Sequence, residues 1–302
     1  MLKIAIIGGT SFIAKSFISL LGAQDIVVKV WSRNGPNYVD YPEKKLDVNE
    51  LLEYDFIFNF MGGGIQPGAD ISKKKLYEIN AFAPMDLLND LSDKKFKGTV
   101  VTFGSYFEIG VQKSKVPTSE YDLITSKLSA INDYAISKRL LTRYIHDNLV
   151  LESFEVKVMH LILPNVFGAG ENEDRLLPYL IRQIKLNNSI QLSNGLQTRQ
   201  YLHVDNIVLF LKEIVLSNSV ESGVFNLGSP HILTIKKLVS IVKKEAIDRH
   251  MDVPTIEIGK LSTRDMHAGY LALDDNLIKS KYGWKNDFDI QSAIGKYFSY
   301  GN

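Results

Sequence analysis

The chain contains no cysteine in its 302 residues, which excludes disulfides, thiolate nucleophiles and cysteine-ligated metals. A basic excess is missing too, since 35 Lys and Arg balance 34 Asp and Glu to a formal net charge of +1. A general nucleic-acid-binding protein normally carries a basic surplus, so we expect no nucleic-acid partner. The sequence also contains no pattern typical of a metal site, and we expect no metal.

Long hydrophobic runs are missing as well. The apolar stretch at residues 1–7 is too short and too weakly charged for a secretory signal peptide, and no run of about 18 apolar residues follows. We therefore expect a soluble, cytoplasmic protein that inserts into no membrane. Because 45% of its residues are hydrophobic, the chain is long enough for one large domain or two modest ones.

Short apolar segments alternate with helical patterns through the first half of the sequence. The expected strands are 2–7, 27–31, 56–60, 99–103 and 156–163, and the expected helices are 11–21, 76–91 (with a kink or start near Pro84) and 131–149. This alternation predicts an α/β fold with a Rossmann-like, doubly wound parallel sheet that is covered by helices on both faces. In such sheets, ligands bind at the carboxyl ends of the strands.

After Val166 the regular alternation of strand and helix patterns ends. A charged, loop-like segment at 171–175 is followed by expected helices at 176–186, 206–216 and 233–247 and by a strand at 200–204. We expect residues 1–165, together with about 199–217, to form a nucleotide-binding domain. Residues 166–198 and 218–302 are expected to form a smaller, mixed domain that walls a substrate cleft.

The first expected strand ends in a turn of a kind that binds nucleotides, Gly8-Gly9-Thr10-Ser11-Phe12-Ile13-Ala14. Between a strand and a helix, the backbone N–H groups of such a turn accept a pyrophosphate. The template has glycine at 8, 11 and 14, but Ser11 and Ala14 hold the second and third places here. Alanine still permits close helix–strand packing, whereas Ser11 fits only if its hydroxyl points away from the phosphate. An ordinary strand–helix turn is the alternative.

The end of the second expected strand indicates which dinucleotide would bind. An acidic residue there would hold the ribose hydroxyls of NAD, but this chain has Ser32 and Arg33. Because a guanidinium forks onto phosphate oxygens, the pair favours NADP(H) over NAD; a solvated loop arginine is the alternative. Asp47 and Val48 are candidates for the adenine edge, although Asp47 is equally suited to cap a helix.

Tyr134 and Lys138 lie four residues apart in a run expected to be helical, so the phenol and the ammonium share one face. A lysine beside a tyrosine lowers the phenol pKa, which makes a proton donor or acceptor for carbonyl reduction or alcohol oxidation. Ser105 ends the fourth expected strand and is suited to polarise a substrate oxygen. Taken alone, the Tyr-x-x-x-Lys spacing is frequent on ordinary helices, and Ser105 fits a turn serine.

In this order and with these gaps, the motifs resemble the extended short-chain dehydrogenase/reductases, in the branch of NAD(P)-dependent sugar-nucleotide epimerases, dehydratases and reductases. The pattern is most similar to nucleoside-diphosphate-4-keto-6-deoxyhexose reductases of the CDP-abequose or CDP-paratose synthase type. The resemblance covers essentially the whole chain. Besides the glycine turn and the Tyr134/Lys138 pair, it includes Asn80, Gly104-Ser105 with Gly110, the segments 163–168 and 199–205, and Gly283-Trp284.

The resemblance implies roles for these residues. Tyr134 would be the acid/base, Lys138 would hold the nicotinamide ribose and lower the tyrosine pKa, Ser105 would bond to the sugar oxygen, and His203 would be structural. The implied cofactor-binding residues are Gly8, Thr10, Ser11, Phe12, Ile13, Ser32, Arg33, Asp47, Val48, Met61, Gly62, Asn80, Tyr134, Lys138, Pro164 and Val166. The implied substrate-binding residues are Ser105, Tyr106, Phe107, Asn165, Arg199 and Arg264, with the two arginines on the diphosphate.

Departures from the family pattern reduce the number of reactions that the chain is expected to catalyse. A 4,6-dehydratase carries an Asp-Glu pair directly after the serine or threonine, where this chain has Tyr106 and Phe107. Glu108 comes one position later, and in an extended segment it would face the opposite side. The 3,5-epimerase/reductases use a cysteine near position 107, which this chain lacks. A simple hydride transfer at one sugar carbon remains.

The sequence therefore favours NADPH-dependent reduction of the C4 keto group of a nucleoside-diphosphate-4-keto-6-deoxy or 3,6-dideoxy hexose, as in deoxysugar and O-antigen (lipopolysaccharide) biosynthesis. A nucleotide-sugar 4-epimerase with tightly bound NAD is the alternative. A non-catalytic NADP(H)-binding sensor or scaffold is the second alternative. We expect a homodimer, which is common in this family, built on the helices around residues 80–91 and 134–149.

Overall fold

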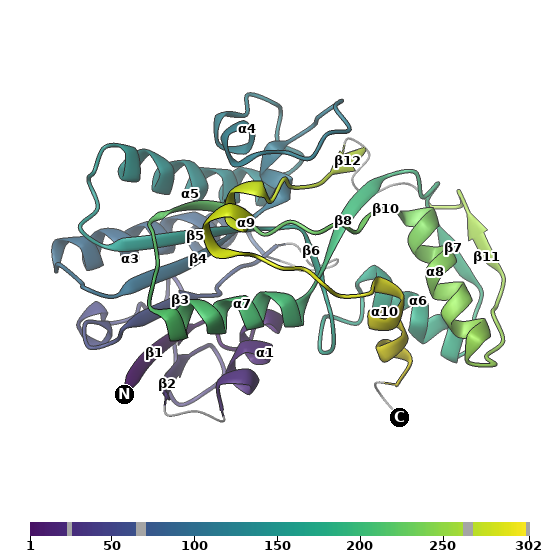
Figure 1. Cartoon of the computed structure of the whole chain (residues 1–302), viewed down its shortest axis with the longest axis horizontal. Coiled ribbons are helices and arrows are strands. Elements are labelled where there is room, and N and C mark those ends of the chain that lie inside the picture. The colour runs from purple at the N-terminus through teal and green to yellow at the C-terminus, as the bar shows by residue number, and fades with distance from the viewer. Residues whose placement is uncertain (23–25, 65–70, 262–267, 300–302) are drawn as a thin grey trace.

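A parallel six-stranded sheet forms the centre of the computed structural model, which describes residues 1–22, 26–64, 71–261 and 268–299. The strands lie in the order β2-β1-β3-β4-β5-β9, and every neighbouring pair is parallel (Figure 1). Their bounds are β1 Leu2–Ile7, β2 Ile26–Trp31, β3 Phe56–Asn59, β4 Thr99–Ser105, β5 Lys157–Leu163 and β9 Gly223–Asn226. The expected α/β fold with a doubly wound, Rossmann-like sheet is confirmed.

Helices cover both faces of the sheet, because successive residues of each strand point to opposite sides. Ile4 and Phe58 enter the core under α1 and α7, whereas Ile57 and Val100 enter the core under α3 and α5. In Figure 1, α1 and α7 overlap the lower part of the sheet, where β1 and β2 lie, and α5 lies above the strands. The bounds of these helices are α1 Phe12–Leu21, α3 Ala83–Asp93, α5 Asp133–Val150 and α7 Val204–Ser217.

Most of the remaining elements form a smaller part of mixed structure, toward the right of Figure 1, whereas the helices at 120–125 and 276–282 contact elements of the larger part. One sheet has the order β10-β8-β12 with β6 beside β8, and another pairs β11 with β7. A separate apolar core joins α6, α8 and α10. The strands are β6 Asn165–Phe167, β7 Ile190–Leu192, β8 Thr198–His203, β10 Ile232–Thr234, β11 Ile256–Ile258 and β12 Tyr270–Leu271. The helices are α4 Glu120–Thr125, α6 Leu176–Lys185, α8 Ile235–Asp248, α9 Asn276–Tyr282 and α10 Ile290–Ser299.

The helix expected at 76–91 is divided into three elements. α2 (Lys73–Tyr77) passes through a π-helical turn, η2 (Glu78–Phe82), into α3, and Pro84 lies in the first turn of α3. Proline is tolerated there because the first N–H groups of a helix have no intrahelical acceptor. π-helical turns are frequent at functional sites, and this one carries Asn80.

β9 belongs to the six-stranded sheet, although we expected residues 218–302 to lie in the second domain. It pairs with β5, with Gly223 opposite Met159. The sequence pattern missed β9 and the short strands of the smaller part because two to four residues are too few to show a period. None of the helices in the described ranges is long and apolar enough to cross a bilayer.

Replacing Phe58 tests the larger core. Its fully buried ring packs edge-on against Phe17 with centroids 4.8 Å apart and stacks at 6.0 Å on Phe60. Phe58→Ala leaves a cavity, and we expect it to lower the free energy of unfolding by about 3–5 kcal/mol in urea titrations. Tyr121→Ala, at a side chain that is 74% exposed, should stay within about 0.5 kcal/mol. Equal losses in both variants would contradict the burial described here.

Candidate active site

A cavity of about 500 Å³ opens at the carboxyl ends of β1 to β5, the edge at which sheets of this kind bind ligands. Residues at or just after the ends of these strands form its wall: Gly8, Ser32, Met61, Ser105 and Pro164. A volume of this size is typical of small-molecule and cofactor sites.

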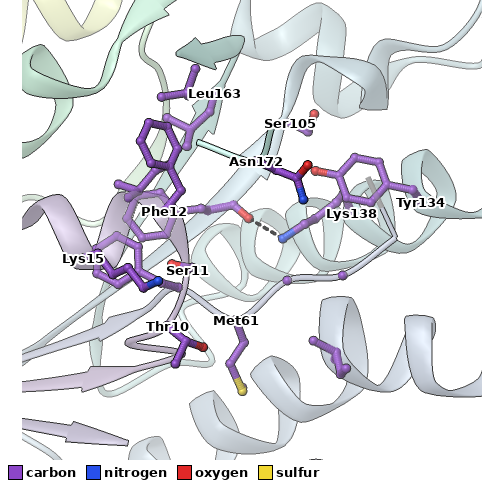
Figure 2. Close-up of a pocket in the computed structure, with 18 of the residues that line it drawn as sticks. Thr10, Ser11, Phe12, Lys15, Met61, Ser105, Tyr134, Lys138, Leu163 and Asn172 are labelled. Atoms are coloured by element: carbon purple, nitrogen blue, oxygen red, sulfur yellow. Dashed lines mark hydrogen bonds between the residues drawn. The ribbon is translucent and has the colours of Figure 1, made fainter. Parts of the chain in front are cut away.

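The turn after β1 allows a ligand to approach the backbone closely. Gly8 has a φ of +82°, and a Cβ there would lie 2.7 Å from the Met61 amide nitrogen, so this position requires glycine. The Ser11 hydroxyl accepts a hydrogen bond from the Ala14 N–H at 3.3 Å and caps α1, which explains the departure from glycine. Thr10, Ser11 and Phe12 line the cavity (Figure 2), as does Ile13.

Ser32 and Arg33 line the same cavity directly after β2. Ser32 is buried, and its hydroxyl donates to the Asn34 carbonyl at 2.8 Å. Arg33 is exposed, so its guanidinium is accessible to a ligand phosphate at the rim.

Asp47 and Val48, the residues expected at the adenine edge, do not line this cavity. Asp47 instead caps the 3-10 turn η1 (Val48–Leu51) by accepting a hydrogen bond from the Asn49 N–H at 3.0 Å. The wall next to Ser32 and Arg33 is made by Val39, Asp40 and Tyr41. The Asp40 carboxylate pairs with Lys75 at 3.1 Å, and the same ammonium pairs with Glu43 at 3.3 Å, so two carboxylates share one cation.

Asn80 supports the cavity from behind rather than lining it. Its amide accepts from the Gly63 N–H and donates to the Gly63 carbonyl, both at 3.0 Å, and it donates to the Ser137 hydroxyl at 3.1 Å. The loop after β3 is thereby tied to α5. Met61 and Gly62 of this loop do line the cavity, and a Cβ at Gly62 would lie 3.8 Å from Lys138 Nζ.

Ser105, Tyr134 and Lys138 meet in the cavity at the end of β4 (Figure 2). The Asn132 side chain caps α5 by accepting from the Ala135 N–H at 2.9 Å, which places Tyr134 in the first turn and Lys138 one turn later. The Ser105 hydroxyl lies beside the Tyr134 phenol and lowers its pKa.

Burial raises the pKa of Tyr134 to about 12 and outweighs the lowering by the Ser105 hydroxyl; the charges of Glu108 and Arg175 act in opposite directions. The expected lowering of this pKa by Lys138 is not found. The reason is geometric, since Lys138 Nζ donates to the Phe103 carbonyl at 2.9 Å rather than to the phenol. Tyr134 is therefore protonated at neutral pH, as a proton donor must be.

Glu108 lies in a 3-10 turn, η3 (Tyr106–Ile109), and not in the extended segment that we expected. The turn opens with a capping box: the Ser105 hydroxyl accepts from the Phe107 N–H at 3.4 Å, and Glu108 Oε1 accepts from the Ser105 N–H at 2.6 Å. Glu108 is consequently fully buried behind Ser105 and does not line the cavity.

The predicted substrate residues fall into two groups. Tyr106 and Asn165 line the cavity, as do Pro164 and Val166 from the cofactor set. Phe107 does not line it, but its ring packs edge-on against Tyr134 with centroids 6.4 Å apart.

Arg199, predicted to hold the diphosphate, does not line the cavity. Arg199 is buried, and its guanidinium donates to the carbonyls of Thr198 at 2.9 Å and Ala268 at 2.7 Å. Arg264 lies outside the described residues. His203 has the expected structural role, since its side chain accepts from the Asp205 N–H and caps α7.

Asn172 and Arg175 line the cavity although the sequence analysis did not single them out. Asn172 points toward Tyr134 and Lys138 in Figure 2. Arg175 pairs with buried Glu171 at 3.3 Å. The one sequence feature that could have indicated these two residues is the charged segment at 171–175, but its composition is that of an ordinary loop.

Comparison with related sequences agrees with this geometry. The family described as "NAD dependent epimerase/dehydratase family" matches residues 4–228. A CDP-abequose synthase of Salmonella muenchen is 23% identical over 230 residues, covering 74% of this chain and 69% of that protein. An ADP-L-glycero-D-manno-heptose-6-epimerase of Brachyspira hyodysenteriae is 25% identical over 323 residues, covering 97% and 96%.

Solved structures share the fold at low identity. "MoeE5 in complex with UDP-glucose and NAD" superposes with a TM-score of 0.81 at 18% identity, covering 98% of this chain and 97% of that one. "RMD from Pseudomonas aeruginosa complexed with NADPH" reaches a TM-score of 0.75 at 18% identity, covering 99% and 98%. The chain is therefore a member of the NAD dependent epimerase/dehydratase family of extended short-chain dehydrogenase/reductases, enzymes that modify nucleotide sugars.

Proposed function

We propose that the protein reduces the C4 keto group of a nucleoside-diphosphate-4-keto-6-deoxy or 3,6-dideoxy hexose with NADPH. The observation that carries the proposal is the chemistry of the cavity wall. Ser105, Tyr134 and Lys138 face the same space as the glycine turn, and Asp40 is the one carboxylate among the described residues that line it. Asp40 belongs to the wall next to Ser32 and Arg33 and shares Lys75 with Glu43, so Ser105 and Tyr134 are accompanied by the Lys138 ammonium rather than by a carboxylate of the wall.

These residues fit a nicotinamide dinucleotide. The glycine turn at the start of α1 directs backbone N–H groups toward a diphosphate, and Gly62 leaves the backbone close to Lys138. When bound, the nicotinamide would supply the hydride. The protonated Tyr134 donates a proton to the forming alkoxide, the Ser105 hydroxyl shares its charge, and Lys138 holds ribose hydroxyls.

The same wall argues against dehydration of the sugar. Elimination of water needs an acid and a base next to the reacting carbons, and the 4,6-dehydratases use an Asp-Glu pair for this. Glu108 is the carboxylate nearest to Ser105 in the sequence, but it is fully buried and both of its oxygens accept hydrogen bonds. Tyr106 and Phe107 stand where a dehydratase would carry its acidic pair.

The preference for NADPH follows from Ser32 and Arg33. The exposed guanidinium at the rim suits a 2′-phosphate, and the nearby Asp40 is engaged with Lys75, which it shares with Glu43. The CDP-abequose synthase and the "dTDP-4-dehydro-6-deoxyglucose reductase" of Escherichia coli among the relatives agree with a reductase that acts on a deoxysugar.

A nucleotide-sugar epimerase that uses NAD is the second candidate. The heptose epimerase matches over 97% of this chain, and an epimerase needs the same Ser105, Tyr134 and Lys138 to oxidise and reduce one carbon in turn. The two reactions differ in what happens to the cofactor: a reductase exchanges it after each turnover, whereas an epimerase retains it.

We further propose a homodimer. Phe82 of η2 is 46% exposed, and Ile136 and Leu140 of α5 are 43% and 40% exposed. These apolar side chains lie on the pair of helices that we expected to form the contact.

Purified protein tests the cofactor and the reaction together. We expect it to release little nucleotide on denaturation and to consume NADPH, followed by the loss of NADPH absorbance, with one member of a panel of 4-keto-6-deoxy sugar nucleotides. Retained NAD without net consumption would establish the epimerase instead. A protein that binds neither NADPH nor NAD would refute both the reductase and the epimerase.

Tyr134→Phe tests the proton donor. The substitution removes one hydroxyl and keeps the ring, so NADPH binding measured by fluorescence should persist. The rate of ketone reduction should fall at least about 100-fold, the usual contribution of general acid catalysis. Tyr121→Phe on exposed α4 removes a hydroxyl far from the chemistry and serves as the matched control. Full activity of the Tyr134 variant would remove this mechanism.

Arg33→Ala tests the choice of cofactor. Loss of the guanidinium should raise the KM for NADPH about 10-fold or more, the effect of about 1.4 kcal/mol of lost charge-assisted bonding, with little change for NADH. Lys237→Ala on α8 removes an exposed positive charge elsewhere and should change neither. Equal effects on the two cofactors would show that Arg33 does not contact a 2′-phosphate.

A further inference from the structure

A buried carboxylate lies directly behind the reacting groups and has no part in the reaction as proposed so far. Glu108 is fully buried, and both of its oxygens accept short hydrogen bonds. Oε1 accepts from the Ser105 N–H at 2.6 Å, and Oε2 accepts from the Thr142 hydroxyl at 2.5 Å. A buried carboxyl group is costly unless its surroundings use its charge or its hydrogen bonds, so this residue calls for an explanation.

The hydrogen bonds continue from Glu108 to β5. The Thr142 hydroxyl lies 2.8 Å from His160 Nε2, and the Thr102 hydroxyl lies 2.7 Å from His160 Nδ1. Burial and the charge of Lys138 lower the pKa of His160 to about 3, so its ring is neutral. If Glu108 is ionised, all three hydrogen bonds point toward the carboxylate: Thr102 donates to His160, His160 donates to Thr142, and Thr142 donates to Glu108.

Lys138 shares this buried region. Its side chain is buried, and its Nζ donates to the Phe103 carbonyl, while Glu108 holds the N–H of Ser105 two residues later. A carbonyl and the N–H two residues later point to the same edge of a strand. The cation and the carboxylate are therefore fixed by adjacent groups on one edge of β4, and removing either would leave the other buried with its hydrogen bonds but without the opposite charge beside it.

We propose that Glu108 is a positioning residue for the reaction: its carboxylate fixes the Ser105 amide at the end of β4 and supplies the negative charge that keeps Lys138 protonated beside Tyr134. The role in turnover rests on the proposed reductase function. The charge pairing itself does not, because it is a property of the protein without substrate.

The surrounding charges support the pairing. Burial lowers the pKa of Lys138, and Glu108 opposes this; burial raises the pKa of Glu108, and Lys138 and Arg139 oppose that. Glu108 also raises the pKa of Tyr134, and Arg175 lowers it. The titratable and charged groups around the pair are Tyr134, Lys138 and Arg139 of α5, His160 of β5, and Arg175 at the start of α6.

The sign of the expected effect follows from these directions. Reduction requires protonated Lys138 and protonated Tyr134, so activity is lost as the pH rises through either pKa. The Glu108 charge raises both values. Its removal must therefore move the alkaline limb of the pH–rate profile to lower pH.

Glu108→Gln is the direct test, because glutamine keeps the shape and an acceptor for the Ser105 N–H but removes the charge. We expect the alkaline limb of kcat/KM for NADPH-dependent reduction to move down by about one pH unit or more, the shift typical of losing a nearby opposite charge. Thr102→Val breaks the same network at His160 but keeps the Glu108 charge. It should lower the thermal stability and leave the limb in place. An unmoved limb in Glu108→Gln, or an equal shift in Thr102→Val, would overturn the proposal.

Carbon-13 NMR of labelled glutamate side chains tests the pairing without turnover and with wild-type protein. We expect one carboxyl resonance, absent from Glu108→Gln, that is ionised at pH 8 and titrates above the ordinary glutamate range. In Lys138→Met its midpoint should rise by about one pH unit or more. A midpoint unchanged by Lys138→Met would refute the pairing. The proposed function could fail in the activity assay while this titration still succeeded, so the two failures are distinguishable.

Discussion

The parallel pairing of β4 with its two neighbours is the constraint on which the active site depends. β4 pairs with β5 from Thr99 to Ser105, but its pairing with β3 ends at Thr102. The last residues of β4 therefore extend beyond β3, and their backbone groups are available to side chains. Lys138 Nζ donates a hydrogen bond to the Phe103 carbonyl, and Glu108 accepts one from the Ser105 N–H. A longer β3 would compete for these groups.

The polar side chains buried at the end of β4 lower the stability of the fold, and they are the groups on which the proposed chemistry depends. A buried ammonium, a buried carboxyl and a buried imidazole each cost free energy unless they are hydrogen-bonded or charge-balanced. α5 reduces that cost, because Tyr134, Lys138 and Thr142 follow one another at helical spacing on the face toward β4. One helix thus supplies the proposed proton donor, the cation and the hydroxyl that holds the carboxylate.

Members of one fold at 18% identity differ in how the shared positions are filled. In this chain the middle position of the glycine turn is a serine that caps α1. The residues after Ser105 are aromatic, and their rings pack against each other with centroids 5.1 Å apart. Such details, rather than the fold, decide which reaction the cavity supports.

The sequence by itself determined the features that depend on local pattern. Apolar segments and turn residues indicated five of the six strands of the large sheet, and the four-residue spacing put Tyr134 and Lys138 on one helical face. It could not determine that Asp47 caps a turn, that Arg199 binds carbonyls, or that Arg175 reaches the cavity. Only the tertiary structure decided these, because a side chain's partners come from distant segments, and the direction in which it points depends on packing rather than on its neighbours in the chain.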